Sequence, residues 1–285
     1  MKIKRLIKTA LALLFLVCIL CEVLFSANYL NISTLNIKTD KTTASFRAVL
    51  VSDLHNKEYG ENNIELIKTI YRQKPDIIFA VGDMLNKGDK NRDIALNFYS
   101  QLVRIADVYC CLGNHENSYY DTEGLKQDIK KTGAHLLEDE MEKVDFISGS
   151  ITVGCLAHYP YYSSDAPDYD NYQRHFLDSF IEQEKDNFSI LLAHEPEYFY
   201  WSLKDKNLDL MLCGHTHGGI IRLPFIGGLI APNQGLLAHN GDILPDYTKG
   251  YYSSGTANLY VTGGLGNEFI PRFFNPPEIS VINVN

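Results

Sequence analysis

Short apolar runs alternate with amphipathic stretches through the first half of the chain, after an apolar N-terminal segment. Three such runs, at residues 46–51, 77–81 and 108–112, are predicted to be buried strands. Between them, residues 64–71 and 94–105 carry apolar side chains at helical spacing. Strands and helices that alternate at this spacing predict βαβ units with a parallel or mixed sheet, and therefore an α/β fold.

The second half of the chain is less regular. We predict helices at residues 125–131 and 174–184, and strands at residues 144–147, 151–156, 188–193 and 208–213. The first two of these strands are expected to pair around the turn Ser148-Gly149-Ser150. From residue 218 to residue 285, glycines and prolines separate short strands, which predicts a second, antiparallel sheet region.

The first thirty residues have the composition of a targeting segment. Four basic residues precede an uncharged run at residues 9–21, and apolar residues continue after Glu22. A span from Leu6 to Tyr29 is long enough to cross a bilayer, so we predict an uncleaved signal-anchor at residues 1–30. A cleaved signal peptide is the alternative, although no Ala-x-Ala site follows the apolar core. Both interpretations leave the basic residues in the cytoplasm and place the remaining chain outside it.

The net charge of the remaining chain limits the kinds of partner that it can bind. The net charge of the 285 residues is −9, and the first thirty residues contribute +3, which leaves −12 for the rest. An acidic body argues against binding nucleic acid through a broad basic face, and bound cations would offset part of its charge. The polar residues 31–45 are predicted to be a linker to one domain at residues 46–285.

The six cysteines do not have the spacing of a zinc ribbon. Cys18 and Cys21 lie in the N-terminal segment, whereas the other four lie in strand-like runs, at Cys110, Cys111, Cys155 and Cys213. We interpret these four as small buried apolar side chains. One disulfide between neighbouring strands is the alternative in an oxidising compartment.

Five short fragments carry Asp, Asn or His directly after a predicted strand. They are Asp53-Leu54-His55, Gly82-Asp83, Gly113-Asn114-His115-Glu116, Ala193-His194-Glu195 and Gly214-His215-Thr216-His217-Gly218-Gly219. In open α/β sheets, functional groups gather at the carboxyl ends of the strands. Carboxylates and imidazoles are ligands of divalent transition metals. The fragments hold more ligands than one metal needs, which predicts two metals and therefore phosphoryl chemistry.

Residue spacing supports a shared site. Asp53 and His55 are two residues apart, as are His215 and His217, so each pair is expected to point to one side of an extended backbone. Glycines precede Asp83 and two further candidate ligands, where they would allow sharp turns and a close approach to the metals.

Each candidate also has a structural alternative. Asp53 and Asp83 could cap helices, and His194 taken alone fits a core histidine. The complete set favours the metal interpretation. The remaining histidines fit no ligand position and are predicted to be structural, although one of them also ends a predicted strand: His135, His175, His239 and the strand-end His158.

The order Asp-x-His, Gly-Asp, Gly-Asn-His-Glu, a later His and Gly-His-Thr-His resembles the calcineurin-like metallophosphoesterase superfamily over residues 46–285. Within it, the chain resembles the bacterial membrane-associated branch, which includes peripheral UDP-diacylglucosamine diphosphatase-type enzymes. The segments that carry this second resemblance are Cys213–Gly219, Tyr260–Gly266, Pro271-Arg272-Phe273 and Pro276–Ile279. The resemblance implies a sandwich of two mixed β-sheets flanked by helices.

The resemblance also implies a role for each fragment. The first of two divalent metal ions would be held by Asp53, His55 and His217, and the second by Asn114, His194 and His215, with Asp83 bridging both. His115 would be catalytic, stabilising the developing charge and protonating the leaving oxygen. Oxygen and nitrogen ligands without thiolate fit Mn, Fe or Zn.

The implied function is a membrane-anchored, extracytoplasmic phosphoesterase that hydrolyses phosphate esters through a metal-activated hydroxide. Its substrate would be a small molecule or lipid with a phosphate-ester or pyrophosphate group. One alternative is a lipid-linked or nucleotide-sugar diphosphatase. An alternative of another class is a non-catalytic envelope binding protein.

Residues around the candidate ligands carry further expectations. Glu116 is predicted to orient the site from behind the ligands. Arg272 is predicted either to reach a substrate phosphate or to have an ordinary surface or salt-bridging role. Tyr119 and Tyr120 follow the His115 motif and are placed to touch substrate. The Tyr-rich stretch at residues 159–172 is interpreted as a packed surface loop, with a specificity flap or a membrane contact as alternatives.

Overall fold

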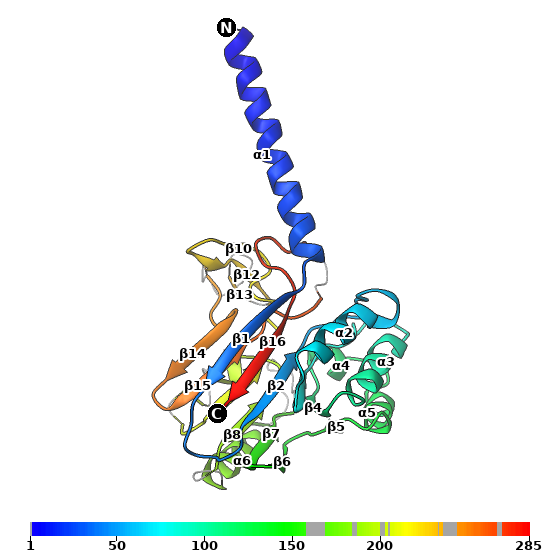
Figure 1. Ribbon diagram of the computed structural model, residues 1–285, viewed down its shortest axis with the longest axis vertical. Coiled ribbons are helices and arrows are strands. Elements are labelled where there is room, and N and C mark those ends of the chain that lie inside the picture. Colours follow the sequence, from blue (N-terminus) through cyan, green and yellow to red (C-terminus); the bar gives the residue numbers. More distant parts are fainter. Residues whose placement is uncertain are drawn as a thin grey trace.

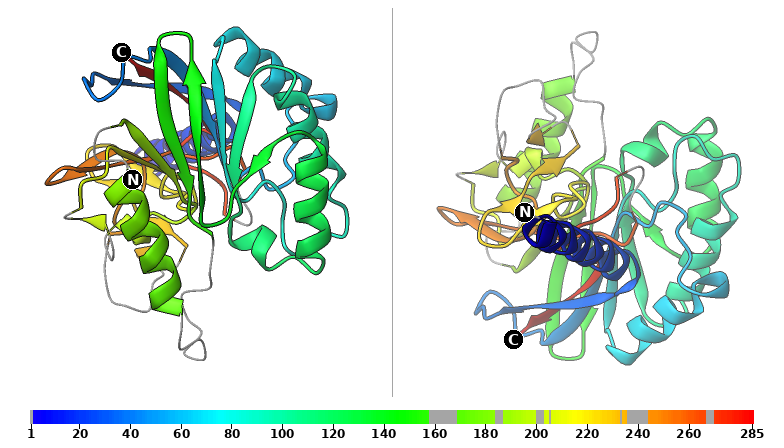
Figure 2. Two further views of the ribbon diagram at one scale, coloured as in Figure 1. Left: turned by 90° about the horizontal axis from the view of Figure 1, so that it is seen from below. Right: turned by 90° about the horizontal axis from the view of Figure 1, so that it is seen from above.

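The computed structural model describes residues 2–157, 169–183, 187–199, 203–204, 206–232, 234–235, 244–266 and 270–285. Within these residues, two six-stranded mixed sheets pack face to face, and helices cover their outer faces (Figures 1 and 2). The predicted α/β sandwich of two mixed sheets flanked by helices is therefore confirmed.

The first sheet has the strand order β1-β16-β2-β3-β4-β5. Its parallel strands are β2 (Phe46–Val51), β3 (Ile77–Val81), β4 (Asp107–Cys111) and β5 (His135–Leu136). β16 (Glu278–Val284) runs antiparallel to β2, and β1 (Asn31–Ile37) is parallel to β16. The three strands predicted in the first half of the chain are confirmed, and they run in the same direction.

β1 occupies the beginning of the stretch predicted to be a linker, so that prediction is wrong for residues 31–37. Every residue of β1 pairs with β16. The side chains alternate: Leu35 and Ile37 pack against the core between the sheets, whereas Thr34 and Asn36 are exposed. Because half of this edge strand is polar, composition suggested a linker. Only residues 38–45 connect β1 to β2.

The second sheet has the order β14-β15-β9-β8-β7-β6. Its strands are β6 (Glu140–Phe146), β7 (Gly149–Cys155), β8 (Ser189–Leu192), β9 (Leu210–Cys213), β14 (Gly250–Ser254) and β15 (Ala257–Val261). The predicted pairing of β6 with β7 is confirmed. The prediction of an antiparallel region after residue 218 is only partly right, because β15 is parallel to β9 and β16 belongs to the first sheet. Two short antiparallel pairs join β10 (Arg222–Leu223) to β11 (Gly227–Gly228) and β12 (Ile230–Ala231) to β13 (Gln234–Gly235).

Alternation along the strands builds three apolar layers. In β2, Ala48 and Leu50 face the second sheet, whereas Val49 and Val51 face the outer helices. The helices of the first sheet are η1 (Glu61–Asn63), α2 (Ile64–Arg72), α3 (Asp93–Leu102), α4 (Asn114–Asn117) and α5 (Thr122–Lys131), and α6 (Tyr169–Gln183) covers the second sheet. All six cysteines lie in the described residues and are free, and the four in or beside strands are buried in these layers.

The N-terminal segment forms one helix, α1 (Lys2–Asn28), which projects from the domain (Figure 1). It is long and apolar enough to cross a membrane, and nearly all of its residues are exposed. β1 begins three residues after the helix ends. Because β1 and β16 run away from the helix and β2 runs antiparallel to them, β2 and its parallel neighbours end on the side of the domain from which α1 emerges.

Candidate metal centre

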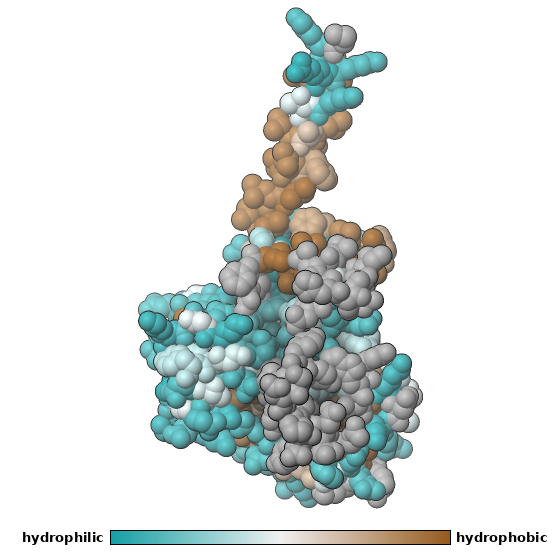
Figure 3. Space-filling model, turned by 180° about the vertical axis from the view of Figure 1, so that it is seen from behind, coloured by the Kyte–Doolittle hydropathy of each residue, from teal (hydrophilic) through white to brown (hydrophobic). Residues whose placement is uncertain are grey.

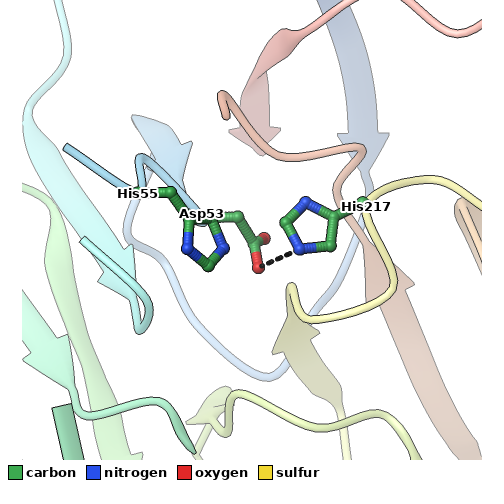
Figure 4. A group of neighbouring side chains, drawn as sticks. All are labelled: Asp53, His55 and His217. Carbon is green, nitrogen blue, oxygen red and sulfur yellow. Dashed lines mark ion pairs between the residues drawn. The ribbon is translucent and has the colours of Figure 1, made fainter. Parts of the chain in front are cut away.

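The five predicted fragments meet on that side of the domain, beyond the ends of β2, β3, β4, β8 and β9. Among the described residues, three groups offer ligand atoms within 4.8 Å of one another: Asp53 with His55 and His217, His55 with Asp83 and His115, and Asp83 with His194 and His215. All of these side chains are buried. Figure 4 shows the Asp53 carboxylate between the rings of His55 and His217. Residues up to 164 positions apart thus share one centre.

The loops that carry these side chains are tight turns. Asp53, His55, His215 and His217 have φ angles of 53°, 51°, 67° and 49°, so the prediction of extended backbone at the two pairs is wrong. A non-glycine residue in this region costs about 1–3 kcal/mol and persists only where its surroundings hold it. Here the N–H groups of Asp53 and His55 each donate to a carbonyl of Gly82-Asp83 at 3.0 Å. The site loops therefore hold one another in shape.

Two glycines allow this close contact between loops, as the sequence predicted. Gly82 has a φ of 70°, and a Cβ there would lie 2.7 Å from the backbone of Gly113. At Gly214, a Cβ would lie 2.6 Å from Oδ2 of Asp53. A side chain at either position would separate loops that carry candidate ligands.

Hydrogen bonds fix the tautomer of three candidate histidines. Nδ1 lies 2.9 Å from Oδ1 of Asn86 in His55, 2.9 Å from the Val81 carbonyl in His194 and 3.3 Å from the Gly266 carbonyl in His217. The amide of Asn86 donates to other groups, so its Oδ1 faces His55 as an acceptor. Because each partner is an oxygen acceptor, Nδ1 carries the proton of the neutral ring and Nε2 then holds the lone pair.

Two of these lone pairs point toward a carboxylate. Among the described residues, Nε2 of His55 and of His194 is buried without a hydrogen-bond partner. Nε2 of His194 lies 3.0 Å from Oδ2 of Asp83, and Nε2 of His55 lies 3.8 Å from the same oxygen. A buried lone pair that faces a carboxylate oxygen is unfavourable unless a positive charge, a proton or a metal ion, lies between them. The residues present therefore fit divalent metal ions.

The electrostatics of the centre favour positive charge. Burial raises the pKa of Asp53 above its usual value, although His194 opposes this effect. Asp83 is also buried, but the attraction of His194, His55 and His115 outweighs burial and holds its pKa well below its usual value. Burial of His194 is likewise outweighed by Asp83 and Asp53, which raise its pKa well above the usual value. Bound cations would supply the charge that these groups favour.

The third fragment places two more candidates in the centre. Oδ1 of Asn114 lies 3.1 Å from Nδ1 of His215, about the ~3 Å that separates two ligands of one metal at ordinary bond lengths. The backbone N–H of His115 donates to Oδ1 of Asp83 at 2.9 Å. Its ring Nδ1 accepts the N–H of Lys87 at 3.2 Å, so the proton of the neutral imidazole is on Nε2.

Glu116 holds two loops of the first sheet from behind the centre. Its buried carboxylate accepts four backbone N–H groups, those of Gly113 at 2.9 Å, Asp83 at 2.8 Å, Met84 at 2.6 Å and Leu85 at 3.2 Å. These bonds join the turn after β3 to the start of α4. The geometry agrees with the orienting role predicted for Glu116.

Arg272 has neither of the roles predicted for it. The side chain is only 1% exposed, and its guanidinium donates to backbone carbonyls instead of to a carboxylate or to solvent. Its acceptors include Gly266 at 3.1 Å, His217 at 3.3 Å and Gly264 at 3.3 Å. Asn275, which the sequence did not single out, donates to the same His217 carbonyl at 2.7 Å. Burial lowers the pKa of Arg272 to about 10.

The remaining predictions concern residues away from the centre. His135 pairs with Glu142 at 3.1 Å and stacks on Tyr109, which agrees with a structural role. His175 is exposed on α6, whereas His158 and His239 lie outside the described residues. So does most of the Tyr-rich stretch, since the described chain resumes at residue 169. Of the two tyrosines after the His115 motif, Tyr119 is buried and Tyr120 is exposed.

Comparisons with known proteins identify the family of this chain. Residues 46–219 match the calcineurin-like phosphoesterase family. The chain is 32% identical to the uncharacterized metallophosphoesterase YkuE of Bacillus subtilis (strain 168), over 84% of this chain and 79% of that protein. It is 24% identical to phosphodiesterase YaeI of Escherichia coli (strain K12), over 85% and 83%, and 26% identical to UDP-2,3-diacylglucosamine pyrophosphatase LpxG of Chlamydia muridarum (strain MoPn / Nigg), over 90% and 89%. The chain belongs to the calcineurin-like phosphoesterase family and is a metal-dependent phosphoester hydrolase.

Proposed function

We propose that the protein is a membrane-anchored phosphoesterase with two divalent metal ions, Mn, Fe or Zn. One ion would be held by Asp53, His55 and His217, the other by Asn114, His194 and His215, with Asp83 shared. The observation that carries the proposal is that the buried Nε2 atoms of His55 and His194 both face one oxygen of Asp83, at 3.8 Å and 3.0 Å.

The chain's own residues would orient the substrate phosphate and move one proton. When bound, two divalent ions lower the pKa of a water molecule and neutralise phosphate oxygens. Nδ1 of His55 bonds to Asn86 and Nδ1 of His194 bonds to the Val81 carbonyl, so each ring would present Nε2 to an ion. His115, whose Nε2 carries the proton, would donate it to the departing oxygen.

A substrate panel tests this proposal. The full-length chain in detergent, supplied with Mn²⁺, should hydrolyse p-nitrophenyl phosphate or bis-p-nitrophenyl phosphate, and elemental analysis should find two divalent ions per chain. His135→Gln is a matched control, because His135 is a histidine outside the centre. Less than one ion per chain and no turnover of any phosphate or pyrophosphate ester would contradict the proposal and favour a non-catalytic binding protein.

For the membrane, we propose that α1 is a single-pass anchor with the domain outside the cytoplasm. The support is the exposed apolar surface of α1 and the basic residues at its start, which favour the cytoplasmic side. In right-side-out cells, added protease should degrade the domain and leave a membrane-bound N-terminal fragment. A domain that is protected until the cells are lysed would contradict this orientation, and a domain released without protease would indicate signal cleavage.

A second candidate is a lipid-linked or nucleotide-sugar diphosphatase. It is favoured by the likeness to LpxG, a UDP-2,3-diacylglucosamine pyrophosphatase, over 90% of this chain. Hydrolysis of UDP-sugars or undecaprenyl diphosphate much faster than of the p-nitrophenyl esters would select this candidate. The opposite order of rates would select a general phosphodiesterase or phosphatase.

A further inference from the structure

The end of α1 is bound directly to the domain. Oε1 of Glu22 accepts the N–H of Phe274 at 3.0 Å and the hydroxyl of Ser26 at 2.8 Å. The Asn275 N–H donates to the same Ser26 hydroxyl at 3.3 Å, and Lys57 donates to the Ala27 carbonyl at 3.1 Å. Glu22 therefore lies at the domain surface, so its charge need not enter the apolar part of a bilayer. These contacts fix one face of the domain toward the membrane that α1 would cross.

An apolar hairpin stands on this face. The tip between β10 and β11 is formed by Pro224, Phe225 and Ile226, of which Phe225 is fully exposed and Ile226 is 56% exposed. Phe274, which is 47% exposed, lines the same open hollow as the tip. The sequence from residue 223 to residue 238 contains no Asp, Glu, Lys or Arg.

The hairpin is held to the segment on which α1 docks. The Arg222 N–H donates to the Phe273 carbonyl at 2.9 Å, and Ile221 pairs with Phe273 in an isolated bridge. Glu22 binds the next residue, Phe274, so helix and hairpin share one support. At the same end of α1, the side chain of Leu24 is 54% exposed and that of Phe25 is 50% exposed. Figure 3 shows hydrophobic side chains beside the base of α1, next to the apolar part of the helix.

We propose that the hairpin tip Leu223–Ile226, together with Phe274, inserts into the lipid surface around α1. The inference rests on the proposed function in one respect, since it requires α1 to be a membrane anchor. Exposed Phe and Ile side chains are unfavourable in water and are stabilised at a bilayer interface, where their apolar surface is removed from water. An exposed apolar patch marks a protein or a membrane contact, and its continuity with α1 selects the membrane.

Insertion would also place the metal centre at the level of the lipid headgroups. Arg222 donates to the Gly218 carbonyl, and Asn275 donates to the His217 carbonyl at 2.7 Å. The segments that carry the patch are therefore bonded directly to the loop that carries His217. A centre held in this position is suited to a phosphate or pyrophosphate group carried by a membrane lipid.

Depth-dependent fluorescence quenching tests the insertion. The only tryptophan, Trp201, is replaced by Phe in every variant, and a new tryptophan is introduced as Phe225→Trp, with Ile226→Trp as a second variant. The matched control is Ile147→Trp, because Ile147 is as exposed as Phe225 but lies in the β6–β7 turn at the amino end of β7, remote from α1. Each full-length variant is reconstituted into phosphatidylcholine–phosphatidylglycerol vesicles that contain a lipid with a nitroxide near its headgroup.

We expect the tryptophans at 225 and 226 to show blue-shifted emission and strong quenching by the labelled lipid, and the tryptophan at 147 to show neither. Equal, weak quenching at all three positions in vesicle-bound protein would overturn the insertion alone. The water-soluble quencher acrylamide separates a further outcome. A tip tryptophan that neither acrylamide nor the labelled lipid quenches would be covered by protein, which would overturn the insertion. A chain that fails to float with the vesicles would instead overturn the anchor, and with it the inference.

Discussion

The first sheet supplies both carboxylates among the candidate ligands, whereas the second sheet supplies three histidines, His194, His215 and His217. In the turn that carries Asp83, the N–H groups of Asp83, Met84 and Leu85 point to one buried carboxylate behind the centre. In the second half, the carbonyl groups of His217, Gly264 and Gly266 point to one buried guanidinium. One half of the centre therefore needs an acceptor behind it, and the other half needs a donor.

Glu116 and Arg272 meet these opposite needs. Glu116 accepts four N–H groups from the first half, and Arg272 donates to carbonyls of His217, Gly264 and Gly266 in the second half. Among the described residues, neither charge forms a salt bridge within 4 Å. Backbone dipoles stabilise each buried charge instead. A charge behind a metal centre can therefore hold the loops in shape without direct contact with substrate.

Removal of the metal ions should have the largest effect, and this effect should differ between the two halves of the centre. Chelation is expected to abolish hydrolysis and to lower the stability of the fold, by about 2.7 kcal/mol for each ion that had been present at 100 times its Kd. Without cations, Asp53 and Asp83 repel each other, with protonated His194 beside them, whereas burial lowers the pKa of His217 and keeps its ring neutral. Hydrogen exchange should therefore increase more at residues 53–56 and 82–85 than at residues 214–219.

Added Mn²⁺ should restore both activity and protection of these amides. An equal rise of exchange in both halves would show that repulsion between carboxylates does not dominate the metal-free centre. Unchanged activity after complete chelation, checked by elemental analysis, would contradict the dinuclear proposal itself.

Replacement of the proposed proton donor should have the next largest effect. His115→Gln is expected to lower kcat by roughly 10²–10⁴-fold, because the amide cannot transfer a proton to the leaving oxygen. The metal content should stay the same, since His115 is proposed not to bind an ion. His135→Gln, outside the centre, should leave kcat unchanged. Loss of one ion from the His115→Gln chain would instead make His115 a ligand, as its proximity to His55 and Asp83 allows.

Substitution of Glu116 and of Arg272 tests directly whether each charge supports one half of the centre. Glu116→Gln turns an amide NH₂ toward backbone donors, and Arg272→Lys replaces a planar group of five donors with a single ammonium. Loss of such supports lowers metal affinity or activity by roughly 10–100-fold. Glu116→Gln should weaken both ions, because it acts through the turn of the shared Asp83. Arg272→Lys should weaken mainly the ion bound by His217.

Titration of each chelated variant with Mn²⁺ in a calorimeter measures this difference. If both variants weaken the binding of the same ion, or if both weaken the binding of the two ions equally, then Glu116 and Arg272 do not support different halves of the centre.

The sequence predicted the parts of the centre that have local signatures. An apolar run followed by Asp, Asn or His marks the end of a strand, and a glycine beside it marks a close approach, so the candidate ligands can be recognised in the sequence alone. The backbone at Asp53 and His215 was not predicted, because bonds from distant loops select its left-handed conformation. The role of Arg272 was also missed, since bonds to backbone carbonyls leave no partner side chain to recognise in the sequence. β1 was missed because an edge strand with polar residues on both faces has the composition of a linker.

The smallest expected effect concerns the contact between α1 and the second half. Ser26→Ala removes a buried hydroxyl that accepts the Asn275 N–H, a loss worth about 0.5–1.5 kcal/mol of stability. Asn275 also donates to the His217 carbonyl. In a chain reconstituted into bilayer nanodiscs, amide hydrogen exchange should therefore rise at residues 217–220 and stay unchanged at residues 83–85. Thr9→Ala, which removes an exposed hydroxyl bonded within α1, is the matched control. A rise confined to α1 would mean that the anchor holds the domain without supporting the centre. A rise in both halves would mean that the support reaches Asp83 as well, through Lys57 and its bond to Ala27, so that the anchor steadies the whole centre.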